Sequence, residues 1–117
     1  MNGYTDLKAT RYYDIFKGIP GQINVSYLTD QINAWHKHQI QTDYWFCIAG
    51  KIRVGLCEAG EARFVDLLPG TVLEITPGIW HGYKPLEPNS VLLYYTTEKY
   101  NPDDELRCEI GSFNENW

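Results

Sequence analysis

All three histidines of the chain lie in two short segments that also carry acidic and aromatic side chains. His36 and His38 are two residues apart, Asp43 follows five residues after them, and His81 comes soon after a Pro77-Gly78 turn. Residues i and i+2 of a strand point to the same face, so a strand through 34–38 would direct both imidazoles to one side. An imidazole titrates near neutral pH and can therefore act there as a general base or acid. If that side is the interior of a small barrel, the histidines share one pocket.

In the segments that must position these residues, apolar and polar side chains alternate with the two-residue period of strands. Apolar and polar residues alternate in Gly21–Thr29, which places Ile23, Val25 and Tyr27 on one face. Pro, Gly and Asn turns separate the remaining strand candidates, which we place at 34–38, 44–48, 51–56, 62–68, 72–76, 80–84 and 91–97. Short strands at this spacing predict an all-β sandwich or barrel.

Outside these strands the pattern is weaker. A helical period appears faintly in Leu7–Phe16, and the segment from Asn101 is typical of a surface loop or a short capping helix. We expect Gly111–Trp117, polar except for Phe113 and Trp117, to pack on a neighbouring element or to fray.

Composition excludes several classes of protein. The chain has 117 residues, 44% of them hydrophobic, which indicates one folded domain (1–117) and not a disordered segment. A net charge of −5 argues against nucleic-acid binding. Charges or Gly and Pro interrupt every apolar run, and the first residues lack a signal-peptide pattern, so no membrane association is expected. The three cysteines, Cys47, Cys57 and Cys108, form no CxxC pair, which predicts a reducing, cytoplasmic location.

The two histidine segments together resemble the cupins. The first cupin motif, H-x-H followed by E and then G, is similar to His36-Lys37-His38, four residues, Asp43, six residues, Gly50. The second, G followed by P-x-G-x-x-H, is similar to Gly70 through Thr76-Pro77-Gly78-Ile79-Trp80-His81. The resemblance covers about 21–107 and implies a double-stranded β-helix, the RmlC-like jelly-roll barrel, with its core at about 21–100.

Within the cupins the chain resembles the dTDP-4-dehydrorhamnose 3,5-epimerases and the dTDP-sugar 3,4-ketoisomerases. The match lies in His81-Gly82-Tyr83 and in the segment from Leu93 to Pro102. It implies an epimerase or isomerase of a nucleotide-linked 4-keto-6-deoxy sugar, acting without a metal in polysaccharide or deoxysugar biosynthesis. By the same resemblance His36 is the general base, Tyr94 the opposing acid, Tyr100 a stacking partner for thymine, and His81 a sugar ligand. The H-x-H pair, with His38 assisting His36, is that of the ketoisomerases.

This chemistry is physically reasonable, because a C4 ketone acidifies the protons on the neighbouring carbons. Two departures from the epimerases stand out: Asn33 replaces an arginine, and Gly111–Trp117 holds no match for the acid that partners the base. An anionic nucleotide needs cations, for which Lys37, Arg53, Arg63 and Lys84 are candidates. We name Arg53 as the candidate for substrate binding, together with Trp80 beside His81.

Two alternatives stay open. His36, His38, Asp43 and His81 form the three-His, one-carboxylate set of metal-dependent cupins, and such ligands suit Fe, Ni, Mn or Zn. The missing arginine and acid would also fit a cupin that binds sugar without catalysis. For the preferred reading we expect a nucleotide sugar as ligand, and we expect a homodimer, since a small barrel with 15% aromatic residues has apolar surface to hide.

Overall fold

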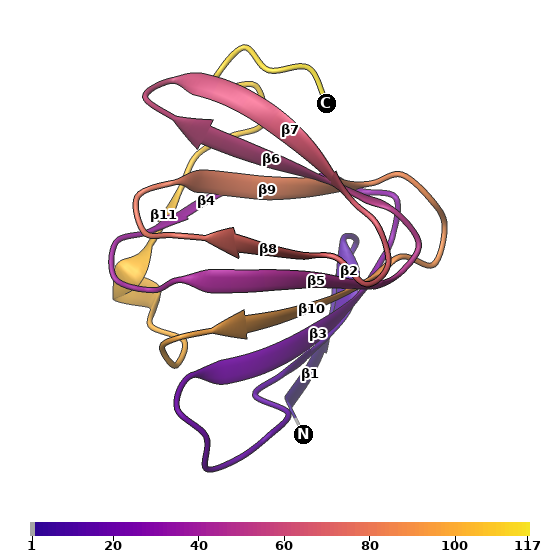
Figure 1. The fold of residues 1–117 in the computed structure, drawn as a ribbon, viewed down its shortest axis with the longest axis vertical. Coiled ribbons are helices and arrows are strands. Elements are labelled where there is room, and N and C mark those ends of the chain that lie inside the picture. Colours follow the sequence, from indigo (N-terminus) through magenta and orange to yellow (C-terminus); the bar gives the residue numbers. More distant parts are fainter. Residues whose placement is uncertain (1) are drawn as a thin grey trace.

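The computed structural model describes residues 2–117 and consists of two antiparallel sheets packed face to face, as Figure 1 shows. Six strands form the first sheet in the order β1 (Asn2–Thr5), β2 (Ala9–Tyr13), β3 (Gln22–Leu28), β10 (Val91–Thr96), β5 (Asp43–Ala49) and β8 (Val72–Ile75). Five strands form the second in the order β11 (Glu105–Arg107), β4 (Asn33–His38), β9 (Trp80–Pro85), β6 (Ile52–Glu58) and β7 (Glu61–Leu67). Each strand expected from the alternation is present, and the arrangement is the cupin jelly roll.

Besides the unexpected N-terminal strand β1, two segments differ from the sequence-based expectation. The region with a faint helical period contains strand β2, whose residues Ala9 and Arg11 are buried while Thr10 and Tyr12 are half-buried. The segment after Asn101 holds a 3-10 turn (Pro102–Asp104), as expected, but the chain then continues into the unexpected strand β11. β11 pairs with β4 and places Arg107 opposite His36. No helix within residues 2–117 has the length and apolar character needed to cross a membrane.

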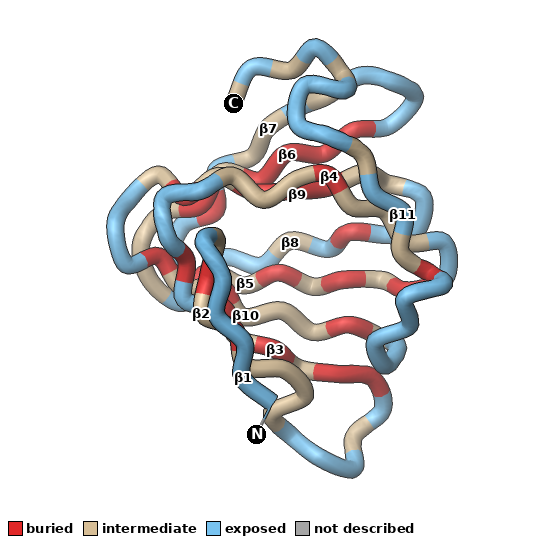
Figure 2. The backbone as a smooth tube through the Cα atoms, turned by 180° about the vertical axis from the view of Figure 1, so that it is seen from behind, coloured by how far each residue is buried: buried red, intermediate tan, exposed pale blue. Residues whose placement is uncertain are grey.

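The interior of the sandwich is apolar at one end and polar at the other. Four positions of β3 are buried. The first three, Gln22, Asn24 and Ser26, are polar, and only Leu28 at the end of the strand is apolar. Figure 2 shows this alternation of buried and less buried positions continuing across the first sheet. The apolar core around Ile52, Val54 and Leu92 fills one end of the interior, where burial of hydrocarbon stabilises the fold.

The other apolar residues of β3 therefore face out of the sandwich. Ile23 and Val25 are half-buried and Tyr27 is exposed, so the face that they share is the outer one. The reversal of the usual polarity keeps polar groups inside. It leaves the interior beside β3 able to hold a polar ligand.

A glycine on β9 permits the close approach of the strands that carry the histidines. A Cβ at Gly82 would lie 2.4 Å from the Cβ of Ala34 on β4 and 2.7 Å from the carbonyl oxygen of Asn33. The register of these strands places His36 opposite His81. A larger residue at position 82 would push β4 away from β9.

The C-terminal segment packs on the outer face of the second sheet. The ring of Trp117 lies 5.0 Å from that of Trp35 and 5.0 Å from that of Phe64, and its carbonyl oxygen accepts a hydrogen bond from Lys84. In Figure 1 this yellow segment lies beside β6 and β7. The expectation that residues 111–117 pack on a neighbouring element is confirmed.

Candidate functional site

A cavity of about 730 Å³ lies between the two sheets, and polar side chains from both of them line it. His36, His38 and His81 lie on the wall formed by β4 and β9, while Tyr94 of β10 lies on the wall formed by the first sheet. The predicted catalytic and sugar-binding residues therefore share one cavity. Tyr100, also predicted as a ligand, stands at its rim with 65% of its surface exposed.

The three imidazoles form a cluster on one wall. The alternation of β4 brings His36 and His38 to the same face, as the sequence predicts. The ring of His81 lies 5.3 Å from that of His38 and 6.4 Å from that of His36. The wall thus carries three imidazoles, two from β4 and a buried one from β9.

The deepest of these groups, His81, lies against a buried carboxylate. Its Nδ1 donates to the carbonyl oxygen of Ile79 (3.0 Å), and its Nε2 lies 3.9 Å from Oδ2 of Asp43. Burial lowers the pKa of His81 to about 4, so the ring is neutral at pH 7 and its Nε2 carries a lone pair. Asp43 itself accepts hydrogen bonds from Gln41 and from the indole of Trp45.

The acidic partner of His36 comes from β11. The Nδ1 of His36 donates to Oε1 of Glu105 at 3.0 Å. This hydrogen bond, followed by that from Arg107, lowers the pKa of Glu105 to about 2. Glu115, the acid among residues 111–117, bonds to Gly111, Phe113 and Trp117, and the acid that contacts His36 comes from an earlier position, at Glu105. Sequence reasoning missed it because a three-residue strand leaves almost no periodicity to detect.

A turn holds Glu105 in place. The carboxylate of Asp104 accepts hydrogen bonds from the backbone N–H groups of Gln39, Ile40 and Gln41, at distances from 2.9 to 3.3 Å. These residues connect β4 to β5. The bonds thus fasten the end of the 3-10 turn to the loop that follows the histidine strand, and β11 begins at the next residue.

The second nitrogen of His36 faces an amide oxygen. Its Nε2 lies 3.2 Å from Oδ1 of Asn33, which also accepts a hydrogen bond from Lys8 at 3.3 Å. The imidazole therefore sits between two acceptors, the other being Glu105. This arrangement suits the imidazolium that forms when the ring takes a proton from a substrate.

An arginine reaches the cavity from a strand that the sequence analysis did not identify. Arg11 on β2 is 8% exposed, pairs with Asp6 at 3.0 Å, and donates to the hydroxyl of Tyr83 at 3.4 Å. Tyr83 also accepts a hydrogen bond from Asn33. The cations of the cavity are thus Lys8, Arg11 and Arg107 among the described residues.

The facing wall holds protonated tyrosines. Burial raises the pKa of Tyr94, and burial likewise raises the pKa of Tyr13, which lines the cavity too. Both phenols therefore carry their proton at pH 7 and can donate it. The amide and hydroxyl side chains of Gln22, Asn24 and Ser26 surround them.

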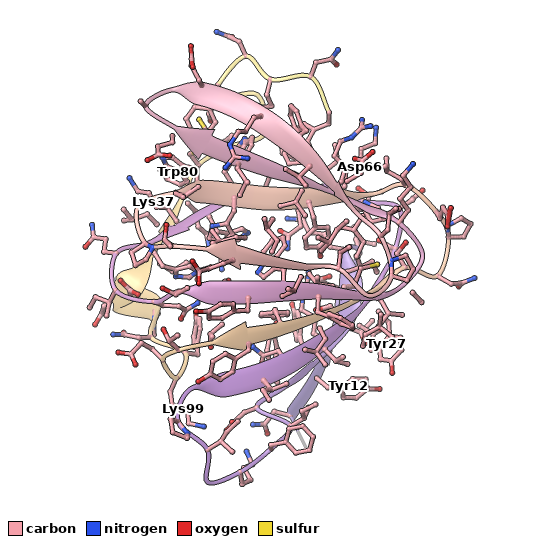
Figure 3. The ribbon with its side chains drawn as sticks, viewed as in Figure 1. Tyr12, Tyr27, Lys37, Asp66, Trp80 and Lys99 are labelled. Atoms are coloured by element: carbon pink, nitrogen blue, oxygen red, sulfur yellow. The ribbon has the colours of Figure 1, made fainter. Side chains whose placement is uncertain are left out.

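Two predicted ligands lie elsewhere. Arg53 pairs with Asp66 at 3.1 Å outside the cavity lining. Trp80 packs against Phe113, and the ammonium of Lys37 lies 4.8 Å from its ring centroid, as Figure 3 shows for the two labelled side chains. Trp80 follows the strand alternation to the face opposite His81. These positions argue against the expected substrate-binding roles of Arg53 and Trp80.

The expected metal set is only partly assembled. Ligand atoms of His38, Asp43 and His81 lie within 4.8 Å of one another. His36 does not belong to this group. Three of the four predicted ligands could therefore converge on an ion.

The chain is similar in sequence to a protein-family model and to a polysaccharide biosynthesis protein. A family model described as FdtA, "WxcM-like, C-terminal", matches residues 9–115. The spore coat polysaccharide biosynthesis protein SpsL of Bacillus subtilis is 34% identical over 88 residues. That match covers 65% of this chain and 58% of SpsL, so the chain spans little more than half of its curated relative.

Solved structures share the fold. The capsular polysaccharide assembling protein CapF of Staphylococcus aureus has a TM-score of 0.79 at 17% identity, over 93% of this chain and 32% of CapF. A dTDP sugar isomerase of Desulfovibrio desulfuricans has a TM-score of 0.70 at 23% identity, over 79% of this chain and 66% of that protein. A mutant 3,4-ketoisomerase QdtA of Thermoanaerobacterium thermosaccharolyticum, in complex with TDP-4-keto-6-deoxyglucose, has a TM-score of 0.64 at 23% identity, over 84% of this chain and 64% of QdtA. At these identities the likeness shows the cupin fold.

Proposed function

The chain belongs to the FdtA family, described as WxcM-like, C-terminal, and from that premise we propose that it is a 3,4-ketoisomerase of a dTDP-linked 4-keto-6-deoxy sugar. The observation that carries the proposal is the pair of imidazoles on one wall, with Glu105 bound to His36. Solved structures of the same fold include a dTDP sugar isomerase and a ketoisomerase in complex with a TDP-4-keto sugar. Those relatives support the substrate class.

The isomerisation moves one proton between carbons and one between oxygens. A base removes the proton from C3 while the C4 carbonyl oxygen gains one, which gives an enediol. The hydroxyl at O3 then loses its proton as C4 gains one, so the ketone now stands at C3 and the atoms balance. Both carbon protons move on one face of the sugar, which two adjacent imidazoles can serve.

We assign the removal of the C3 proton to His36. Glu105 orients its ring through Nδ1 and stabilises the imidazolium once Nε2 has taken the proton. His38, on the same face of β4, is the group that delivers a proton to C4. General acid–base catalysis of this kind contributes roughly 10²- to 10⁴-fold in rate.

Tyr94 is the proposed proton donor to the developing enolate. It lines the cavity on the wall of the first sheet, and its raised pKa keeps the phenol protonated. An O–H aimed at a forming oxyanion stabilises it most in a site that excludes water. In an epimerase, the same tyrosine would instead return a proton to the sugar carbon from the face opposite the base.

The cations of the cavity supply the site for the nucleotide. Lys8 and Arg11 come from the β1–β2 hairpin and its turn, and Arg107 follows Glu105 on β11. Arg11 and Asn33 both donate to the hydroxyl of Tyr83, so a cation lies close to Asn33. We propose that these groups bind the diphosphate, with Tyr100 at the rim against the base.

The test is conversion of dTDP-4-keto-6-deoxyglucose, followed by NMR of the sugar carbons. The proposal expects the carbonyl to move from C4 to C3 in the wild type and in Lys37→Ala, whose side chain lies over Trp80 outside the cavity. Retention of the C4 ketone with inversion at C3 or C5 would identify an epimerase. Tight binding without any change in the sugar would identify a binding protein and contradict the proposal.

A second candidate is a metal-dependent cupin, which the cluster of His38, Asp43 and His81 favours. Neutral imidazole nitrogens and a carboxylate suit Fe, Ni, Mn or Zn, and such an ion would supply Lewis-acid chemistry. Elemental analysis of protein purified without chelators decides between the two. A stoichiometric transition metal, lost in His81→Ala, would support the metal enzyme, whereas full isomerase activity in metal-free protein would support the first proposal.

A further inference from the structure

The strand that carries Glu105 has little pairing of its own. β11 consists of three residues at the edge of the second sheet, and it pairs with β4. A short pairing of this kind is marginal in water, because few hydrogen bonds offset the loss of chain entropy. Asp104 fixes the beginning of β11 through the loop after β4. The register of β11 therefore also depends on what holds its far end.

Backbone hydrogen bonds join that far end to the histidine strand. The N–H of Cys108 donates to the carbonyl oxygen of Trp35 at 3.2 Å, and the N–H of Trp35 donates to the carbonyl oxygen of Cys108 at 3.1 Å. Cys108 directly follows β11, and Trp35 directly precedes His36 on β4. These two bonds thus connect the chain after Glu105 to the residue beside the proposed base.

The C-terminal strap, which we define as residues 109–117, packs on the same Trp35 from outside the sandwich. The ring of Phe113 lies 5.2 Å from that of Trp35, and the ring of Trp117 lies 5.0 Å from it. Figure 2 shows the chain continuing from β11 into this segment over the second sheet. Neighbouring strand residues point to opposite faces, so Trp35 lies under the strap while His36 lines the cavity.

Internal hydrogen bonds give the strap a defined shape. The carboxylate of Glu115 accepts bonds from the N–H groups of Gly111 (2.6 Å) and Phe113 (3.1 Å) and from the indole of Trp117 (2.9 Å). A Cβ at Gly55 would lie 2.5 Å from the ring of Trp117 and 2.8 Å from that of Trp35. Both indoles therefore rest directly on the backbone of β6, and the strap holds Trp35 against it.

We propose that the C-terminal strap positions the proposed base: by packing on Trp35 it keeps β11 in the register that brings Glu105 to His36. Trp117 and Phe113 are its positioning residues, and both lie outside the cavity lining. Loss of their contact with Trp35 loosens the strand after Glu105, so the carboxylate leaves the imidazole for part of the time. The expected effect on rate rests on the proposed function, whereas the effect on the hydrogen bond does not.

The experiment observes the Nδ1–H proton of His36 by NMR of the full chain with isotope-labelled histidine and no substrate. A charge-assisted bond at 3.0 Å should give a downfield signal that exchanges slowly with water, assigned by its loss in His36→Ala. Trp117→Ala should lose this signal, and Trp117→Phe, which keeps a ring on Trp35, should retain it. The Nδ1–H of His81, bonded to the oxygen of Ile79, is the internal reference and should persist in every variant.

Leu67→Val controls for a general loss of stability. Leu67 lies on β7 in a core cluster that includes neither Trp35 nor any strap residue. The variant should lower Tm and keep the His36 signal. A signal that survives in folded Trp117→Ala overturns the proposal, and so does an equal loss in folded Leu67→Val. If Trp117→Ala does not fold, Phe113→Leu takes its place with the same expected result.

Turnover of dTDP-4-keto-6-deoxyglucose is the second readout. Trp117→Ala should lower kcat roughly tenfold and leave KM within roughly twofold, because the strap acts on the base and not on the nucleotide site. Leu67→Val should keep both constants. An unchanged kcat in Trp117→Ala, or a rise in KM alone, overturns the positioning role. A wild type that is inactive on this substrate contradicts the proposed function instead, and the NMR signal then decides the link between the strap and His36.

Discussion

At the scale of single residues, the pair His36–Glu105 separates this site from three histidines gathered by chance. The Glu105 carboxylate lies 3.0 Å from Nδ1, and the Asn33 amide oxygen lies 3.2 Å from Nε2, where it can accept a hydrogen bond once the ring has been protonated. A ring held in this way has a fixed orientation and a ready counter-charge. Those are the two properties that a strand-borne general base needs.

The Glu105 carboxylate should make stability depend on pH. Its pKa is about 2, below the ordinary 4.5, because His36 donates a hydrogen bond to the charged form. A depressed pKa contributes stability that is fully present above pH 4.5 and is lost as the pH falls towards 2. We expect the difference in Tm between wild type and Glu105→Gln to be largest above pH 5 and to shrink steadily below pH 4.5.

Thermal unfolding monitored by circular dichroism from pH 2 to pH 7 measures this difference. The exposed Glu98→Gln serves as the control, and its Tm should follow that of the wild type throughout. A Tm difference for Glu105→Gln that stays constant over the whole range would show that the carboxylate is not the group responsible.

At the scale of elements, the site depends on a turn and a three-residue strand. Asp104 is 6% exposed and caps three backbone N–H groups after β4, and Glu105 begins β11 directly after it. Loss of these bonds should release β11 from its register against the histidine strand. The element would then fail to present the partner of His36.

Asp104→Ala should therefore lower both stability and activity. Hydrogen bonds to a charged acceptor are worth about 2 kcal/mol, and for a domain of this size that lowers Tm by roughly 5–10 °C. We expect kcat to fall roughly tenfold, because the orientation of His36 is loosened and the base itself is retained. Asp103→Ala, on the exposed side of the same turn, should change neither quantity. Equal effects of the two substitutions would contradict the role given to Asp104.

The elements that sequence reasoning predicted are those with a clear local signal. Alternating residues and Pro-Gly turns located the strands of the jelly roll, and the H-x-H spacing placed His36 and His38 on one face. The missed elements have no such signal. Strand β2 is polar on its buried face, with Arg11 inside, and β11 has three residues. Trp80 shows the converse problem, since a strand residue adjacent to a site residue, here His81, points to the other face.

At the scale of the whole molecule, the sandwich divides its surfaces by function. One end of the interior is an apolar core and the other is a polar cavity lined from both sheets. On the outer face of the second sheet, Trp117 packs against Trp35 and Phe64. The polarity of β3 fits this division, because it places amides inside the cavity and Ile23, Val25 and Tyr27 on the outer face.

The exchange of the C3 proton with solvent tests the proposed mechanism most directly. The substrate is dTDP-4-keto-6-deoxyglucose in deuterium oxide, and NMR reads the deuterium at each sugar carbon. The wild type and Lys37→Ala should place deuterium at C4 of the product and, by reversal of the step, at C3 of the recovered substrate. His36→Ala should lose this incorporation by roughly 10²-fold or more while remaining folded. Full deuterium incorporation at C3 by His36→Ala would contradict the assignment of His36 as the base.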